Sequence, residues 1–298
     1  MHTSEHSRVP WSGLLIAAAG AIAFSGKAII VKLAYRYNVD AVTLIMYRML
    51  FALPMFLLLA WWSGRRRPKL TGRDWWMLST LGFVGYYLSS FLDFAGLQFV
   101  SAGLERLILY LNPTIVLLAG MLLFHARVTR LQWIALAFSY AGVLVVFGHD
   151  INLAGNDIAM GAGLVFASAV VYSCYLVMSG QFVKRFGSQQ LTGVATSFAC
   201  LFCIAQFFIL RPVGAMHVAP EVIWLSMLNA LLCTFCPVLL IMMAIERIGA
   251  GLTAQIGMVG PISTITMGIL ILGEPFTVWV AIGTSLVLFG VWLLSRAR

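Results

Sequence analysis

Long apolar stretches follow one another along almost the whole chain, and this feature restricts its fold more than any other. Each stretch is long enough, at 1.5 Å per residue, to cross a hydrocarbon core about 30 Å thick. Because the runs are continuous and do not alternate with polar residues, they indicate helices and not barrel strands. We therefore expect an all-α integral membrane protein with ten transmembrane helices. The ten spans cover residues 12–34, 41–62, 75–97, 103–124, 130–148, 157–180, 190–210, 221–246, 250–272 and 276–295.

The composition excludes a water-soluble globular protein. Of the 298 residues, 61% are hydrophobic and only 10% are charged, with a mean hydropathy of +0.97. About 25% charged residues would be ordinary for a soluble domain. The first apolar run, 12–34, is longer than the roughly 7–15 residues of a signal-peptide core, so we expect it to remain as the first helix.

The basic residues predict the orientation. With both termini inside, thirteen Lys and Arg fall in inner segments, and only Lys32, Arg36 and Arg211 fall in outer ones. This bias predicts cytoplasmic termini in a bacterial-type inner membrane. It also accounts for most of the net charge of +9, so we expect no nucleic-acid partner.

An internal repeat is visible at an offset of 148 residues. Segment 102–146 then aligns with 250–294 without a gap and matches at 11 of 45 positions, including Pro113 with Pro261 and Gly142 with Gly290. Chance similarity between two apolar helix pairs is the alternative. Five helices per half would invert the second copy, which is the plan of many secondary transporters, with a substrate site between the halves.

This repeat predicts the division of the chain. The expected parts are a cytoplasmic tail at 1–11, a first repeat at 12–148, an outer linker at 149–156 and a second repeat at 157–298.

Short motifs resemble the EamA-type repeat of the drug/metabolite transporter superfamily. The segment Gly273-Glu274-Pro275, followed by Thr277, Gly283 and Gly290-Val291, resembles the end of that repeat. Further motifs that carry the resemblance are Lys32, Arg48 within Tyr47-Arg48-Met49-Leu50-Phe51, Ser101-Ala102-Gly103 and Pro113. The resemblance implies ten helices in two inverted repeats and carrier-mediated export of metabolites.

Within the superfamily the chain is most similar to YddG-type exporters of aromatic and other neutral amino acids. One departure concerns the first repeat, where His125-Ala126-Arg127 stands in place of the usual Gly-Glu pair. The resemblance therefore implies no role for that acid in the first half.

Ionisable residues inside the spans are the strongest indication of a site, since each costs about 2.5–3.5 kcal/mol to insert. Lys27 is expected to line the substrate pathway and to face a substrate carboxylate. Arg48 is expected either to contact substrate or to act as a structural pin for buried carbonyls or for Asp93. Asp93 is a candidate for binding a substrate ammonium group or a coupling proton. Glu105 and Arg106, in the first turn of their helix, are expected to lie at the membrane interface.

Aromatic and polar side chains complete the predicted pathway. A phenol inside a span needs a partner for its hydroxyl, and a cavity supplies one. Tyr172 and Tyr175 are three residues apart and share a helix face. Simple packing is the alternative for each tyrosine. The residues assigned to the pathway besides the charged ones are Tyr86, Tyr110, Tyr172, Tyr175 and Gln255.

Two prolines at equivalent repeat positions predict symmetric bends. Pro113 and Pro261 lie inside expected spans, where a proline frees a backbone carbonyl. We expect these bends to shape the cavity or to move during alternating access. A static kink needed only for packing is the alternative.

The cysteines imitate a metal site. Cys200 with Cys203, and Cys233 with Cys236, have the spacing of a zinc pattern, but both pairs lie in mid-span. We expect small buried apolar side chains, no metal and no cofactor.

The prediction is therefore a carrier and not an enzyme, because the sequence has no HExxH, phosphate-loop or Gly-x-Ser-x-Gly motif. It is expected to export small metabolites, above all aromatic and other neutral amino acids, by alternating access. The expected partners are a small-molecule substrate and the lipid bilayer, with a monomer as the working unit. The alternatives are an exporter of drugs or nucleotide-type metabolites in the same superfamily, and an intramembrane enzyme.

Overall fold

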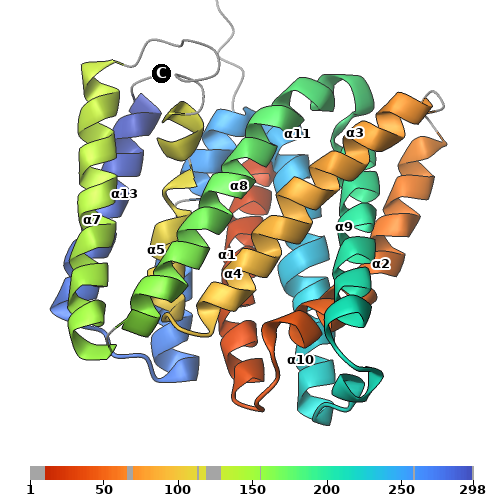
Figure 1. Ribbon diagram of the computed structural model, residues 1–298. Helices are drawn as coiled ribbons and strands as arrows, with labels where there is room; N and C mark the ends of the chain where they lie inside the picture. Colours follow the sequence, from red (N-terminus) through yellow and green to blue (C-terminus); the bar gives the residue numbers. More distant parts are fainter. Residues whose placement is uncertain are drawn as a thin grey trace, which may run out of the picture.

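The computed structural model describes residues 11–65, 70–112, 114–118, 129–154, 156–257 and 259–296. Within these ranges every regular element is helical and no strand occurs (Figure 1). Six described helices are long and apolar enough to cross a membrane, and two shorter apolar segments, Val259–Leu272 and Val278–Leu293, accompany them. The predicted all-helical membrane class is confirmed.

The helices follow the predicted spans closely in the first half. Its elements are α1 (Trp11–Tyr35), α2 (Ala41–Gly64), α3 (Gly72–Gly82), the π-helical η1 (Phe83–Leu88), α4 (Ser89–Leu97), α5 (Ala102–Leu109) and α7 (Arg130–Ala154). The second half contains α8 (Asn156–Phe186), α9 (Ser188–Leu210), the 3₁₀ turn η2 (Val213–Met216), α10 (Pro220–Ala230), the π-helical η3 (Leu231–Phe235), α11 (Cys236–Ile256), α12 (Val259–Met267), the π-helical η4 (Gly268–Leu272) and α13 (Val278–Arg296).

Three boundaries differ from the prediction. Residues 149–154, expected as linker, continue α7, and α11 runs through the expected break at 247–249 to Ile256. A glycine inside a helix costs only about 1 kcal/mol, whereas backbone groups in lipid must be paired within the helix. The glycines at 249 and 251 therefore do not end α11. The span expected at 103–124 is interrupted, because α5 ends at Leu109 and helix resumes at 114–118.

The helices pack mainly across the two halves of the chain. Figure 1 shows α7 beside α13 at one end of the bundle and α2 beside α9 toward the other. Helix α1 packs against α11 and α12, while α8 packs against α4 and α5. Helix α5 also contacts α12. Each half therefore depends on the other for burial of its helix faces.

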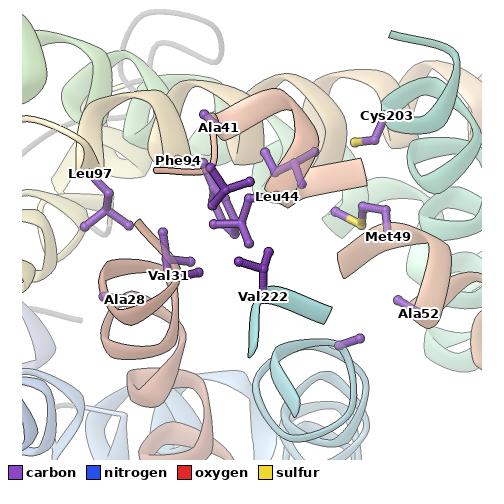
Figure 2. Packing of buried hydrophobic residues seen from close by; sticks show 14 of the residues in the cluster. Ala28, Val31, Ala41, Leu44, Met49, Ala52, Phe94, Leu97, Cys203 and Val222 are labelled. Carbon is purple, nitrogen blue, oxygen red and sulfur yellow. The ribbon is translucent and has the colours of Figure 1, made fainter. Parts of the chain in front are cut away.

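A large apolar cluster joins α1, α2, α4, α9 and α10. Phe94 and Leu44 meet Val31 and Val222 at its centre (Figure 2). Cys203 belongs to the same cluster, as expected of a buried apolar side chain. This packing holds the apolar face of α4 in place. It thereby also fixes the orientation of the polar face on the opposite side of that helix.

Side-chain caps set the ends of two helices. Asp40 accepts hydrogen bonds from the backbone of Val42 (3.0 Å) and Thr43 (3.3 Å) and so begins α2. Thr71 and Asp74 form a reciprocal capping box at the start of α3. These caps fix the residues at which α2 and α3 begin.

Candidate functional site

A cavity of about 310 Å³ lies between the two halves. Residues of α1, α2, η1, α4 and α5 line it from the first half, and residues of α8, η3, α11 and α13 line it from the second. Its volume is at the lower end of the range of about 300–1,000 Å³ that is usual for ligand pockets. The cavity is therefore the candidate site, and it suits a small molecule.

Lys27 lies at the centre of an acidic pair beside this cavity. Its Nζ is 2.5 Å from Oδ2 of Asp93 and 2.9 Å from Oε1 of Glu105. All three side chains are buried, and both Lys27 and Asp93 line the cavity. The structure brings together Lys27 and Asp93, two residues that the sequence assigns to the pathway, and it adds Glu105 as a second partner of Lys27.

Arg48 lines the same cavity with neutral partners. Its Nε donates to Oγ1 of Thr234 (3.0 Å), and its guanidinium lies 4.9 Å from the ring centre of Phe94. Its buried Nη1 has no hydrogen-bond acceptor among the described residues. No described carboxylate lies within 4.0 Å of it, so the ion pair with Asp93 considered from the sequence is not formed.

The interfacial placement expected for Glu105 and Arg106 is wrong. Their exposed fractions are 0% and 7%, because both side chains face the interior, where Glu105 lies 2.9 Å from Lys27 and Arg106 donates to Ser25. The Glu274 carboxylate accepts from the backbone N–H of Ala102 (2.8 Å) and of Gly103 (3.4 Å). Sequence position measures the distance from a helix end but does not reveal what covers that end.

Arg106 is held by neutral groups. Its Nη2 donates to Oγ of Ser25 (3.2 Å), and its guanidinium lies 5.5 Å from the ring centres of Phe24 and Tyr110. It also lies close to Gly260, where an added Cβ would meet Nη2 at 2.5 Å. The glycine therefore makes room for this cation on the cavity wall.

Three of the four predicted tyrosines line the cavity: Tyr86, Tyr110 and Tyr172. The ring centre of Tyr175 is 5.2 Å from that of Tyr86 and 5.7 Å from that of Tyr172, so it supports them from behind. The short contact between Tyr172 and Tyr175 agrees with the helix face that they were predicted to share. Gly85 allows this packing, since an added Cβ there would collide with the ring of Tyr175.

The remaining predicted positions are distributed differently. Gln255 lies in α11, but its side chain is outside the described part of the chain, as is the whole of Pro113. Pro261 is the third residue of α12, in its first turn, where a missing N–H costs no helical hydrogen bond. It is therefore not inside a continuous span. Near it, the Tyr110 hydroxyl donates to the carbonyl of Gly257, which joins the two halves.

Small polar residues of the lining were not assigned from the sequence. Ser89, Ser90, Ser168 and Thr234 contribute hydroxyl groups to the cavity. Ser and Thr in membrane helices commonly bond to a carbonyl of their own turn, so their presence in a span is no sign of a site.

Comparison with known proteins decides the family. The model of the EamA-like transporter family matches residues 11–148 and, separately, 159–296. The chain belongs to the EamA-like transporter family. The second EamA match begins 148 residues after the first, which is the offset of the internal repeat.

Relatives of this EamA protein carry the same general description. The uncharacterized transporter YcbK of Bacillus subtilis (strain 168) is 30% identical, over 97% of this chain and 95% of the relative. The uncharacterized transporter YyaM of the same organism is 26% identical, over 83% of this chain and 81% of the relative. A protein of known crystal structure superposes with a TM-score of 0.63 over 96% of this chain and 98% of its own, at 17% identity, and shows the fold alone.

Family and relatives together make this chain a multi-pass membrane transporter and not an enzyme. Glu274 of the Gly273-Glu274-Pro275 motif has a structural place in this EamA protein: it caps α5 across the two halves. The corresponding segment of the first repeat, His125-Ala126-Arg127, lies outside the described residues.

Proposed function

We propose that this transporter exports small metabolites, above all aromatic and other neutral amino acids, by alternating access through the central cavity. The observation that carries the proposal is the free donor of Arg48 in a cavity walled by aromatic rings. A buried donor without an acceptor costs about 1–3 kcal/mol, and a bound carboxylate would remove that cost.

Arg48 is a better carboxylate anchor than Lys27. The ammonium group of Lys27 is already held by Asp93 and Glu105, whereas the guanidinium of Arg48 has only neutral partners. Arginine also presents parallel donors that match a carboxylate. The proposed role of Lys27 is therefore to keep Asp93 in place on the cavity wall.

The aromatic wall supplies the apolar part of the site. The rings of Phe24, Tyr86, Tyr110 and Tyr172 border the cavity. Such rings favour edge-to-face contact with a substrate ring, and their faces attract a cationic group. An aromatic amino acid can therefore place its ring against this wall and its carboxylate at Arg48.

Two inverted repeats are the proposed basis of alternating access. The helix pairs support this plan: α1 with α11 corresponds to α8 with α4 when the halves are exchanged. The π-helical segments η1 and η3 begin 148 residues apart and each sends its fourth residue, Tyr86 or Thr234, to the cavity. π-helical turns are frequent at functional sites.

The proposed location is the inner membrane of a bacterium, with ten crossings and both termini in the cytoplasm. The distribution of Lys and Arg supports this orientation, and relatives from Bacillus subtilis support the bacterial setting. A repeat unit of five crossings per half follows from the same arrangement.

A cellular export assay tests the function. Bacteria that overproduce the chain and receive a phenylalanine-containing dipeptide should release phenylalanine faster than bacteria that overproduce Arg48→Gln at the same level. Release of a nucleoside and of a dye-type drug, measured in the same cells, tests the alternative substrates. Unchanged release of every amino acid, with faster release of one of those compounds, would contradict the proposal.

A further inference from the structure

We propose that this carrier accepts aromatic monocarboxylates, including those that lack an amino group. The inference rests on the proposed function and extends its substrate class to acids without an amino group. Two features of the cavity carry it: an ammonium group that the chain itself supplies, and one cation in excess of the acids.

The place that a substrate ammonium group would take is already filled. Lys27 Nζ lies 2.5 Å from Asp93 Oδ2 and 2.9 Å from Glu105 Oε1, with all three side chains buried. A second ammonium group at Asp93 would stand close to Lys27, and like charges repel strongly in a medium of low dielectric constant. An amino group therefore adds little to binding in this cavity.

The charges around the cavity do not balance. Among the described residues they are the cations Lys27, Arg48 and Arg106 and the acids Asp93 and Glu105. Lys27 contacts both acids, whereas no described carboxylate lies within 4.0 Å of Arg48 or Arg106. The close partners of Arg48 are Thr234 and Phe94, and those of Arg106 are Ser25 and two aromatic rings, so one positive charge on the cavity wall remains uncompensated.

A bound monoanion removes this imbalance, and a zwitterion does not. An unpaired charge in a low-dielectric site is costly. A ligand with a net charge of −1 therefore gains binding free energy by neutralising this charge, which a ligand without net charge does not. The carboxylate would lie at the free Nη1 of Arg48, and a single aromatic ring would pack against Tyr86 and Tyr172. The volume of about 310 Å³ suits one ring with a short acid chain.

Counterflow in proteoliposomes that contain the full chain tests this inference. Labelled phenylalanine is the tracer, and the unlabelled competitors are phenylalanine, 3-phenylpropionate, which lacks the amino group, and phenethylamine, which lacks the carboxylate. We expect 3-phenylpropionate to inhibit at least as strongly as phenylalanine. Phenethylamine should need a concentration about tenfold higher or more, which corresponds to about 1.4 kcal/mol.

The outcomes separate the inference from the proposed function. If phenylalanine exchanges and 3-phenylpropionate does not compete, the inference is wrong and the amino-acid proposal stands. If labelled 3-phenylpropionate exchanges and phenylalanine does not, the inference stands and the amino-acid proposal fails. Exchange of neither compound overturns both.

A substitution at Lys27 makes the test sharper. Lys27→Met removes the internal ammonium group and frees two carboxylates, so inhibition by phenethylamine should become at least about tenfold stronger and that by 3-phenylpropionate weaker. Lys32→Met, on the same helix but outside the cavity lining, is the matched control. An unchanged order of competitors in Lys27→Met would overturn the inference, and the wild-type series decides alone if this variant does not fold.

Discussion

At the scale of single residues, Arg48 is a buried cation that has no acid beside it among the described residues. A charge inside a membrane span costs about 2.5–3.5 kcal/mol on insertion scales. A residue kept only for stability would be expected to recover that cost through an ion pair, whereas Arg48 has a hydroxyl group, a ring and a free donor.

Arg48→Gln therefore distinguishes a substrate contact from a structural pin. We expect an unchanged or higher thermal midpoint, because an unpaired buried charge is removed. The KM for phenylalanine in counterflow should rise about tenfold or more, since a hydrogen bond to a charged group contributes about 1.5–3 kcal/mol. Arg65→Gln is the control, because Arg65 lies at the end of α2 over Trp61, 3.6 Å from its ring centre. A large fall in thermal midpoint with an unchanged KM would make Arg48 structural.

Gly260 tests how tightly the cavity wall is built. An added Cβ would lie 2.5 Å from Nη2 of Arg106 and 2.8 Å from the hydroxyl oxygen of Tyr110, and both groups are held by hydrogen bonds. Gly260→Ala should lower stability by about 1–3 kcal/mol and slow exchange. Gly163→Ala, where an added Cβ meets nothing within 4 Å, should do neither. Equal melting temperatures of the two variants would show that the residues around Gly260 move to make room for the added Cβ.

The positions of some charged residues could be predicted from the sequence, and those of others could not. Lys27, Arg48 and Asp93 could be singled out because a charge inside a membrane span is costly. The burial of Glu105 and Arg106 could not, because it results from contacts with Lys27 and Ser25 of α1, which are far away in the chain. The bias of basic residues in loops has no bearing on such contacts.

At the scale of elements, the start of α5 depends on a carboxylate from the other half of the chain. Glu274 accepts hydrogen bonds from Ala102 and Gly103, where the first turn of a helix has unpaired N–H groups. An anion at this end is favoured by the helix dipole as well. The two halves are thereby joined at the side predicted to face outward.

Glu274→Ala should destabilise the protein by about 0.5–2 kcal/mol, because the cap and its charge are both lost. Glu274→Gln should lose less stability, since an amide oxygen can still accept one hydrogen bond. The thermal midpoint in detergent measures the stability of both variants. Glu221→Ala, an acid in the first turn of α10, is the matched control for an acid that serves its own helix. If all three variants melt at the wild-type temperature, the cap does not stabilise α5.

Helix ends were the least predictable elements. Hydropathy delimits what lies in lipid, but α7 continues past its apolar run to Ala154, and α11 passes through two glycines. The π-helical turns η1 and η3 had no signal in the sequence, because each depends on which neighbouring helix it meets. Their equal spacing of 148 residues became informative only once the repeat was known.

At the scale of the whole molecule, the orientation of the chain can be tested with two glycines. Gly72 at the start of α3 and Gly214 in η2 both have open space where a side chain would be added. In intact cells an impermeant thiol reagent should label Gly214→Cys and spare Gly72→Cys until the membrane is permeabilised. The opposite labelling pattern would show that the topology is inverted. Labelling of both cysteine variants in intact cells would contradict the predicted topology.

The overall plan was the most predictable level. Apolar spans, the basic bias and the 148-residue offset predicted an all-helical membrane protein with an internal repeat, and the family model matches twice at that offset. These signals are strong because lipid forces every backbone group into helices. The substrate is different, since it depends on a few side chains from α1, α2, α4, α5 and α8 that meet only in the folded molecule.

The central claim is that an aromatic amino acid passes through this cavity, and trans-stimulated exchange tests it most directly. Proteoliposomes loaded with unlabelled phenylalanine should take up labelled phenylalanine to a transient maximum above its equilibrium level. Protein-free liposomes should show no maximum, and Arg48→Gln should show a smaller one at the same tracer concentration. A maximum of equal height in Arg48→Gln, or none in the wild-type protein, would contradict the account.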